Sequence, residues 1–196
     1  FLRALRGIAD EHEALLIFDE VQTGFFGSGT PWLWQQKGVE PDLCVFGKKS
    51  QQCGFFSNRR VEQVENNVFK RASRINSTWG GNLTDMVRAR QIIDIILGER
   101  LPANIALRGE QFVDGLRQIA RERGTFTNVR GVGSLAAFTL ESAQVRDDFL
   151  LKLRANKLLA LKSGRQAIRF RLPLSISAAE IDRALERIAE CTPARV

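Results

Sequence analysis

The stretch that decides the fold is ALLIFDEVQTG, which occupies residues 14–24. It opens with five apolar residues and then turns acidic at Asp19 and Glu20. A short apolar run without alternation is typical of an inner strand of a parallel sheet that helices cover on both faces. The two carboxylates then stand at the carboxyl end of that strand, which is the edge where open α/β sheets bind their ligands.

A second apolar run, residues 43–46, predicts a neighbouring strand of the same kind. Between the two runs, residues 31–38 favour a short helix, because Pro31 suits a first helical turn and Gly38 suits a stop. Residues 2–13 favour another helix before them. This β-α-β order predicts an α/β layered sheet. Two inner strands do not complete such a sheet, so we expect an N-terminal half to precede Phe1.

The rest of the chain predicts a second domain. A helix over residues 83–98 would turn Met86, Val87, Ile93 and Ile96 toward a core, and a second helix would follow through residues 105–119. Beyond these, the pattern favours short strands interleaved with helices. The strands are expected at residues 126–129, 135–140, 158–161 and 168–172, one helix at 145–156, and a last helix after a capping box at Ser177 and Glu180. We place one domain at residues 1–103 and the other at 104–196.

Composition excludes several classes of function. The single histidine, His12, excludes a multi-histidine zinc site, and the three cysteines have no CxxC spacing, so we expect no metal site. Free cysteines without a disulfide framework favour the cytoplasm. The net charge is +7, but the basic residues are scattered, so we expect no nucleic-acid partner. No apolar run reaches the ~18 residues of a membrane span, so we expect no membrane partner.

Three interpretations of Asp19 and Glu20 remain at this point. They could be ordinary turn residues, or a Walker B pair that holds magnesium for a nucleotide hydrolase. The hydrolase would also need a GxxxxGK[ST] loop, which these 196 residues lack. In the third interpretation, one carboxylate faces the ring nitrogen of pyridoxal phosphate. Lys48 follows the second strand, so it would share a sheet edge with Asp19 and could form a Schiff base with that cofactor.

Four motifs carry a resemblance to a known family. They are DEVQTG at residues 19–24, FGKKSQQCG at 46–54, RINSTWGGNLTDMVRAR at 74–90 and IRFRLPL at 168–174. The step of 29 residues from Asp19 to Lys48 also matches. Together they resemble the class III pyridoxal-phosphate-dependent aminotransferases. The resemblance implies the C-terminal part of a fold type I transferase, with the end of a large α/β domain followed by a small one.

The resemblance assigns a role to each site residue. Lys48 would carry pyridoxal 5'-phosphate as a Schiff base and move the proton during catalysis. Asp19 would pair with the pyridinium nitrogen, and Gln22 would lie near the phenolic oxygen and the incoming oxo acid. Thr78 would bind the cofactor phosphate in the partner subunit's site, which implies a homodimer. Asn76 and Arg169 would bind substrate, Arg169 through a substrate carboxylate.

Within the class, the chain is most similar to the subfamily that transfers the ε-amino group of L-lysine to 2-oxoglutarate. That reaction gives L-glutamate and 2-aminoadipate 6-semialdehyde. Ornithine, acetylornithine, 4-aminobutyrate and diaminobutyrate remain alternative donors. Because half of the cofactor cage would lie before Phe1, we expect these 196 residues to be inactive by themselves.

Overall fold

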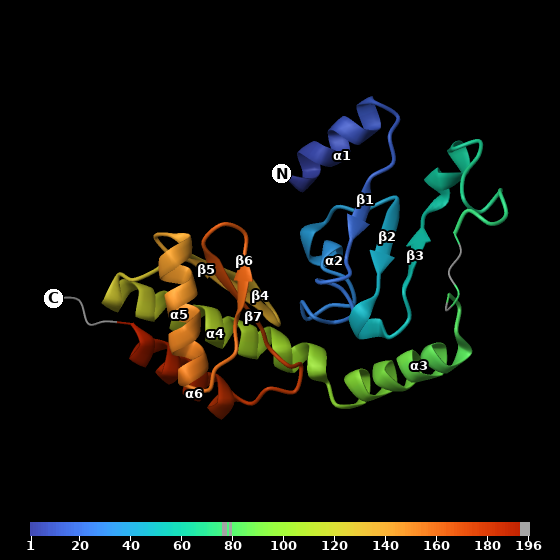
Figure 1. The fold of residues 1–196 in the computed structure, drawn as a ribbon. Helices are drawn as coiled ribbons and strands as arrows, with labels where there is room; N and C mark the ends of the chain where they lie inside the picture. The colour runs from blue at the N-terminus through green and yellow to red at the C-terminus, as the bar shows by residue number, and fades with distance from the viewer. Residues whose placement is uncertain (76–77, 79, 193–196) are drawn as a thin grey trace. The chain divides into compact units, whose positions relative to one another are not determined.

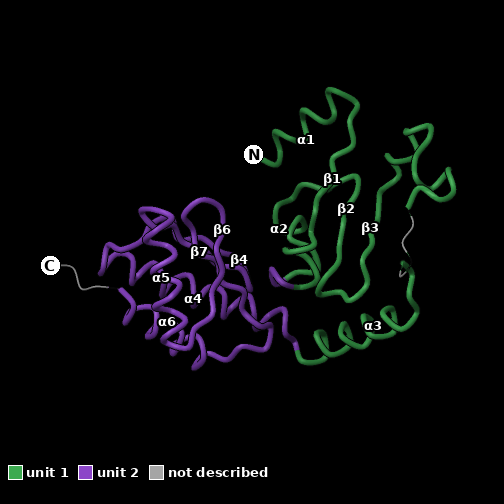
Figure 2. The backbone as a smooth tube through the Cα atoms, viewed as in Figure 1, with its two compact units in different colours: residues 1–26, 30–99 green, residues 27–29, 100–196 purple. Residues whose placement is uncertain are grey.

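The computed structural model describes residues 1–75, 78 and 80–192, and these form two compact units (Figure 2). Unit 1 comprises residues 1–26 and 30–99. Unit 2 comprises residues 27–29 and the chain from residue 100 onward. Within the described ranges, no helix combines the length and the apolarity that a membrane crossing requires.

Unit 1 contains a three-stranded mixed sheet (Figure 1). Strand β1 (Ile17–Asp19) runs parallel to β2 (Leu43–Phe46), and β3 (Gly54–Ser57) pairs with β2 in the antiparallel sense. Helix α1 (Leu2–Glu11) precedes β1, and the short helix α2 (Trp34–Lys37) connects β1 to β2. The predicted β-α-β order is therefore confirmed, and α2 ends as expected at Gly38, whose φ of 62° is left-handed.

Within the described residues, β1 lies at the edge of the sheet with Ile17 56% exposed, and only β2 has strands on both sides. The prediction that β1 is an inner strand concerns a sheet larger than these three strands and stays a prediction. The sequence prediction missed β3, since its four residues show neither a long apolar run nor a clear alternation.

Asp42 holds the amino edge of this sheet together. Its side chain is 1% exposed, and Oδ2 accepts the Leu16 N–H at 2.8 Å and Nη1 of Arg6 at 2.7 Å. Its Oδ1 accepts the amide of Asn58 at 3.1 Å. Leu16 precedes β1, Asn58 follows β3 and Arg6 belongs to α1, so one carboxylate at the start of β2 joins all three neighbouring elements.

The pKa of Asp42 reflects two opposing effects. Burial by itself would raise the pKa of this carboxyl group. The Leu16 N–H, the Arg6 guanidinium and the Asn58 amide all favour the charged form, and together they hold the pKa below its ordinary value. The carboxylate therefore stabilises the fold when it is ionised.

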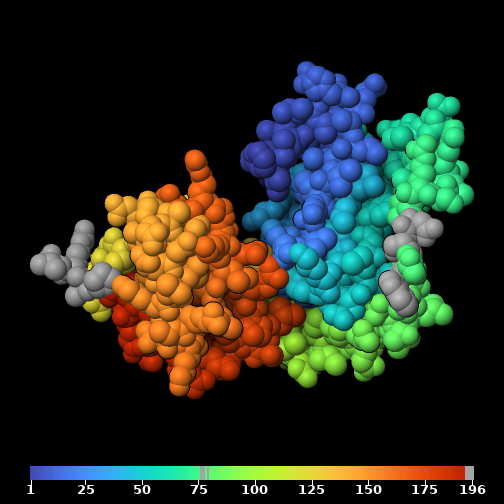
Figure 3. Space-filling view, viewed as in Figure 1, coloured from blue at the N-terminus to red at the C-terminus, as the bar shows by residue number. Residues whose placement is uncertain are grey.

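Helix α3 (Leu83–Gly98) has the predicted bounds but not the predicted burial. Of the four residues expected in a core, only Ile96 is buried, whereas Met86 is 44% and Val87 69% exposed. The prediction is wrong for these two within the described residues. Val87 lies at the surface, and Met86 only borders an apolar cavity that Phe25 and Trp32 also line. In the space-filling view the green segment that contains α3 lies at the surface (Figure 3).

Unit 2 consists of a four-stranded antiparallel sheet and three helices (Figure 1). The strand order is β4-β5-β7-β6. The strands are β4 (Thr127–Val132), β5 (Leu135–Thr139), β6 (Leu161–Ser163) and β7 (Ala167–Arg171), and the helices are α4 (Leu101–Arg123), α5 (Ala143–Ala155) and α6 (Ala178–Cys191). All of these elements were predicted, with ends displaced by a few residues, and the capping box of α6 is present at Ser177 and Glu180.

The helices cover one face of this sheet and bury its alternate residues. Phe138 on β5 and Ile168 on β7 are fully buried, while Arg169 between buried neighbours on β7 is exposed. The Phe138 ring stacks on Phe126 with 4.0 Å between the centroids and meets Phe149 edge-on. This alternation, apolar toward the helices and polar away from them, places Arg169 on the open face of the sheet.

We expect Asp42→Asn to lower the free energy of unfolding of unit 1 by about 3 kcal/mol, because Arg6 and the Leu16 N–H lose the buried carboxylate and Arg6 keeps only its pair with the exposed Asp10. Urea titration followed by tryptophan fluorescence measures this change in unit 1 alone, since unit 2 contains no tryptophan. The folded pKa is lowered, so the contribution of Asp42 is complete above its unfolded pKa of about 3.9 and is lost as the pH falls through the folded pKa. The difference between the wild type and the variant should therefore shrink below about pH 4.

Asp85→Asn is the matched control in the same unit, because Asp85 forms an ion pair with Arg88 on the surface of α3. We expect a change within about 0.5 kcal/mol. An Asp42→Asn variant as stable as this control at neutral pH would show that Asp42 does not hold the sheet.

Candidate active site

The carboxyl edge of the β1–β2 pair brings two predicted site residues together. Asp19 ends β1 and lies opposite Val45 in the parallel register, and Lys48 follows β2 three residues after Val45. Neighbouring strands lie about 4.8 Å apart, so both residues lie at the same edge. The Asp19 carboxylate is exposed, and its Oδ1 accepts the Val21 N–H at 2.9 Å, which turns the chain away from the sheet.

Lys48 lies in a tight hairpin between β2 and β3. It begins the one-turn 3-10 helix η1 (Lys48–Ser50), and its φ of 57° is left-handed. The Gln51 N–H closes the turn onto the Lys48 carbonyl at 3.0 Å. A left-handed conformation is costly for a residue with a side chain, and such backbone strain concentrates at functional sites. The hairpin therefore presents the exposed Lys48 side chain on a fixed and unusual backbone.

Glu20 has a different role from its neighbour Asp19. It is 4% exposed, and its carboxylate accepts the backbone N–H groups of Leu33 at 3.1 Å and Trp34 at 2.8 Å. It also accepts the Thr23 hydroxyl. Glu20 thus caps the start of α2 from the end of β1. These donors engage both of its oxygens, which removes support from the interpretation of Asp19 and Glu20 as a magnesium-binding pair.

Gln22 and Lys49 connect the two loops at this edge. The ammonium of Lys49 donates to the backbone carbonyl of Gln22 at 2.7 Å, across 27 positions of sequence. Lys49 is half-buried, whereas Lys48 is exposed. The structure therefore favours Lys48 over Lys49 as the lysine that meets a ligand. The sequence prediction missed the anchoring role of Lys49 and the capping role of Glu20, since neither has a local sequence signal.

The pKa of Cys44 on β2 shows that the surroundings of Asp19 and Glu20 are negatively charged. Burial, followed by the negative charges of Glu20 and Asp19, raises the pKa of the Cys44 thiol to about 12. A thiol with such a pKa stays protonated and unreactive near neutral pH. Cys44 is therefore a small packing residue, and the region next to Asp19 is negative and suits a cationic ring nitrogen.

The remaining predicted residues are placed as follows. Arg169 lies on β7 of unit 2, exposed and flanked in the strand register by Ala137 and Leu161. Thr78 is exposed and lies before α3 in unit 1. Asn76 lies outside the described residues. The structure thus brings Asp19, Gln22 and Lys48 to one edge, while the roles of Thr78, Asn76 and Arg169 stay predictions.

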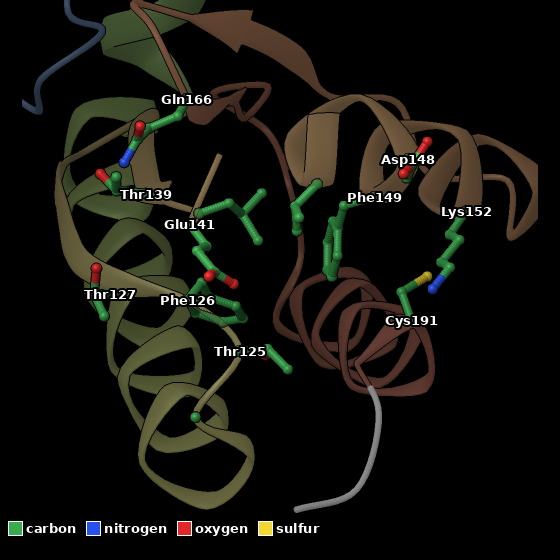
Figure 4. A pocket seen from close by; sticks show the side chains of 13 residues that line it. Thr125, Phe126, Thr127, Thr139, Glu141, Asp148, Phe149, Lys152, Gln166 and Cys191 are labelled. Carbon is green, nitrogen blue, oxygen red and sulfur yellow. The ribbon is translucent and has the colours of Figure 1, made fainter. Parts of the chain in front are cut away.

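A separate cavity of about 760 Å³ lies within unit 2 (Figure 4). Phe126 and Glu141 point into it from one side, and Phe149, Lys152 and Cys191 line the other. It contains none of the predicted site residues. The carboxyl edge of β1 and β2 therefore remains the candidate active site.

Comparison with known proteins decides the family. The profile of the family described as aminotransferase class-III matches residues 1–192 of this chain. The chain belongs to the class-III aminotransferases. The prediction from the four motifs is therefore confirmed, and with it the α/β fold of a pyridoxal-phosphate-dependent transferase. As in the rest of the class, the cofactor is pyridoxal phosphate.

Two relatives indicate where this aminotransferase chain lies within the class. It is 44% identical over 194 residues to a protein of Mycobacterium tuberculosis named L-lysine-epsilon aminotransferase. This match covers 98% of this chain and 43% of the relative. It is 32% identical over 189 residues to an acetylornithine aminotransferase of Pseudomonas putida, with 95% of this chain and 46% of the relative covered. The chain thus spans less than half the length of both relatives.

A solved structure agrees with the fold. The lysine aminotransferase of M. tuberculosis superposes with a TM-score of 0.90 at 44% identity, over 96% of this chain and 44% of that one. The likeness to this structure therefore holds in sequence as well as in fold.

The residues at the carboxyl edge fit the family's cofactor. A protonated pyridine ring requires an anion at its nitrogen, and Asp19 offers an exposed carboxylate at this edge of the sheet. An aldehyde requires a primary amine, and Lys48 supplies an exposed one on the adjacent loop. Glu20 cannot replace Asp19, because its oxygens already accept backbone donors.

We expect Asp19 and Glu20 to respond differently to loss of charge. Glu20→Gln should lower the free energy of unfolding by about 2 kcal/mol, because charged hydrogen bonds to the start of α2 are lost. Asp19→Asn should change it by less than about 0.5 kcal/mol, since an exposed amide oxygen can still accept the Val21 N–H. Urea denaturation followed by tryptophan fluorescence measures both. Equal losses in the two variants would contradict this division of roles.

Proposed function

We propose that this aminotransferase chain carries the catalytic lysine of an enzyme that transfers the ε-amino group of L-lysine to 2-oxoglutarate. The products would be 2-aminoadipate 6-semialdehyde and L-glutamate. One observation carries the proposal, namely the parallel register that places Asp19 at the same sheet edge as Lys48. The 44% identity to the mycobacterial lysine aminotransferase supports the donor.

The residues of the chain then have distinct tasks. The bound cofactor would supply an electron-withdrawing ring for the substrate carbon. The Asp19 carboxylate would hold the proton on the ring nitrogen, and Gln22 would bind near the cofactor's phenolic oxygen and 2-oxoglutarate. The Lys48 amine would take the proton from the substrate carbon and return it.

Three further residues complete the proposed site. Arg169 binds a substrate carboxylate through its planar guanidinium, which carboxylates match in a bidentate pair. Its exposure on the open face of the unit 2 sheet supports this role. We also propose that Asn76 binds substrate and that Thr78 binds the cofactor phosphate.

The domains and the cellular location form part of the same proposal. We assign residues 1–103 to the end of the large cofactor-binding domain and residues 104–196 to the small C-terminal domain. We also place the enzyme in the cytoplasm. The three cysteines, all free, support a reducing compartment.

We expect the protein as the cell makes it to bind pyridoxal phosphate and to convert it to the amine form when L-lysine is added, with loss of the visible absorbance. Ornithine, N-acetylornithine and 4-aminobutyrate should cause little change. Lys48→Ala should reduce the rate by on the order of 10³-fold or more, since it removes the proton carrier. Bleaching by acetylornithine and not by L-lysine would keep the class and overturn the donor. A protein that retains no visible absorbance after incubation with the cofactor and removal of the free cofactor would overturn both.

We propose a homodimer in which Thr78 serves the partner subunit's site. Helix α3 supports it, because Leu83, Val87 and Leu97 are 76%, 69% and 54% exposed. Beside α3, a largely apolar cavity of about 490 Å³ is lined by Phe25, Trp32 and Phe46, among others. Exposed apolar surface of this extent marks an interaction site.

We expect Val87→Glu to convert the dimer into a monomer, because a second copy would have to bury the new carboxylate without a partner. Light scattering after size exclusion measures the mass. Glu99→Gln, at an exposed position of unit 1 just after α3, is the control and should leave the dimer intact. A wild-type protein that is monomeric at micromolar concentration would contradict the proposal.

A further inference from the structure

Two consecutive lysines occupy the same hairpin but have different surroundings. Lys48 is exposed on a left-handed backbone, whereas the half-buried Lys49 reaches across to the Gln22 carbonyl at 2.7 Å. In a 3-10 turn, successive side chains diverge by about 120°. Fixing the side chain of Lys49 therefore also fixes the direction in which Lys48 leaves the backbone.

The Lys49 bond joins the two loops that carry the proposed catalytic residues. Gln22 belongs to the turn that begins at Asp19, and this turn is already held from its other side by Glu20. The hairpin is held at its base by β2 and β3 and is closed by the Gln51 N–H. The Lys49 ammonium is thus a cross-link between the loop of Asp19 and the loop of Lys48.

Packing within the hairpin leaves it little freedom to adjust. A side chain at Gly47 would lie 2.9 Å from the Cys53 sulfur, so the two arms of the hairpin are in contact. The buried Ser50 hydroxyl donates to the Gln52 carbonyl at 2.6 Å. A tight hairpin moves as one piece, so release of Lys49 would displace Lys48 relative to Asp19 rather than loosen Lys48 alone.

We propose that Lys49 is a positioning residue, which sets the distance between the Lys48 amine and the Asp19 carboxylate by binding the Gln22 carbonyl. This inference rests on the proposed function and extends it to a residue that touches no reacting atom. A reactive group misplaced by about 1 Å can lose on the order of 100-fold in rate, so a single hydrogen bond at this place can control turnover.

The test compares Lys49→Met, which keeps the length of the side chain and removes the donor, with Lys49→Arg, which keeps a cationic donor. Lys70→Met is the matched control, because Lys70 also donates to a backbone carbonyl, that of Glu62 at 3.1 Å, in the same unit. Each protein, as the cell makes it, is incubated with pyridoxal phosphate and reduced with borohydride. Peptide mass spectrometry then gives the fraction of Lys48 that carries the cofactor.

We expect Lys49→Met to lower that fraction and to reduce kcat by about tenfold or more while the KM for the donor changes by less than about threefold. Lys49→Arg should recover most of the loss, and Lys70→Met should match the wild type. Hydrogen exchange provides a second readout that needs no cofactor, and Lys49→Met should raise exchange in residues 20–26 and 47–54 together.

The outcomes separate the two proposals. If the wild type itself carries no cofactor on Lys48 after reduction, the proposed function fails, whatever Lys49 does. If the wild type is labelled at Lys48 and Lys49→Met matches it in labelling, kcat and exchange, the positioning role is overturned. If Lys49→Met does not fold, Lys49→Arg decides, since wild-type labelling, kcat and exchange in that variant support the role and their loss overturns it.

Discussion

The buried carboxylate of Asp42 is the interaction on which unit 1 depends. It binds the chain before β1, the residue after β3 and the guanidinium of α1, and so it fixes where β1 begins relative to β2. A shift of one residue between two strands would turn every side chain to the opposite face. The register that places Asp19 opposite Val45 is therefore fixed at the amino ends of the two strands, whereas the proposed active site lies at their carboxyl ends.

The two adjacent carboxylates at the other end of β1 have different surroundings. Glu20 caps α2, and both of its carboxylate oxygens accept backbone N–H groups. Asp19 remains exposed, as its proposed role at the cofactor requires. Since successive side chains of an extended strand point to opposite sides, two neighbouring acids cannot easily share one task.

Much of the fold followed from local pattern. The antiparallel unit 2 was predicted element by element, because its strands alternate and its helices have clear periods and a capping box at Ser177. The prediction was less accurate in unit 1. It treated Met86 and Val87 as core residues, because periodicity reveals an apolar stripe and does not reveal what covers it.

The sequence by itself determined the family and, through the family, the cofactor, because its four motifs are local stretches of the chain that resemble the class III aminotransferases. The same resemblance predicts the roles of Asp19, Gln22 and Lys48. The tertiary structure alone decided which acid is free and which lysine is anchored. Glu20 meets Leu33 and Trp34, and Lys49 meets Gln22, only after the strands have paired. Hydrogen bonds between residues far apart in sequence depend on how the chain folds back on itself, and no spacing along the chain encodes them.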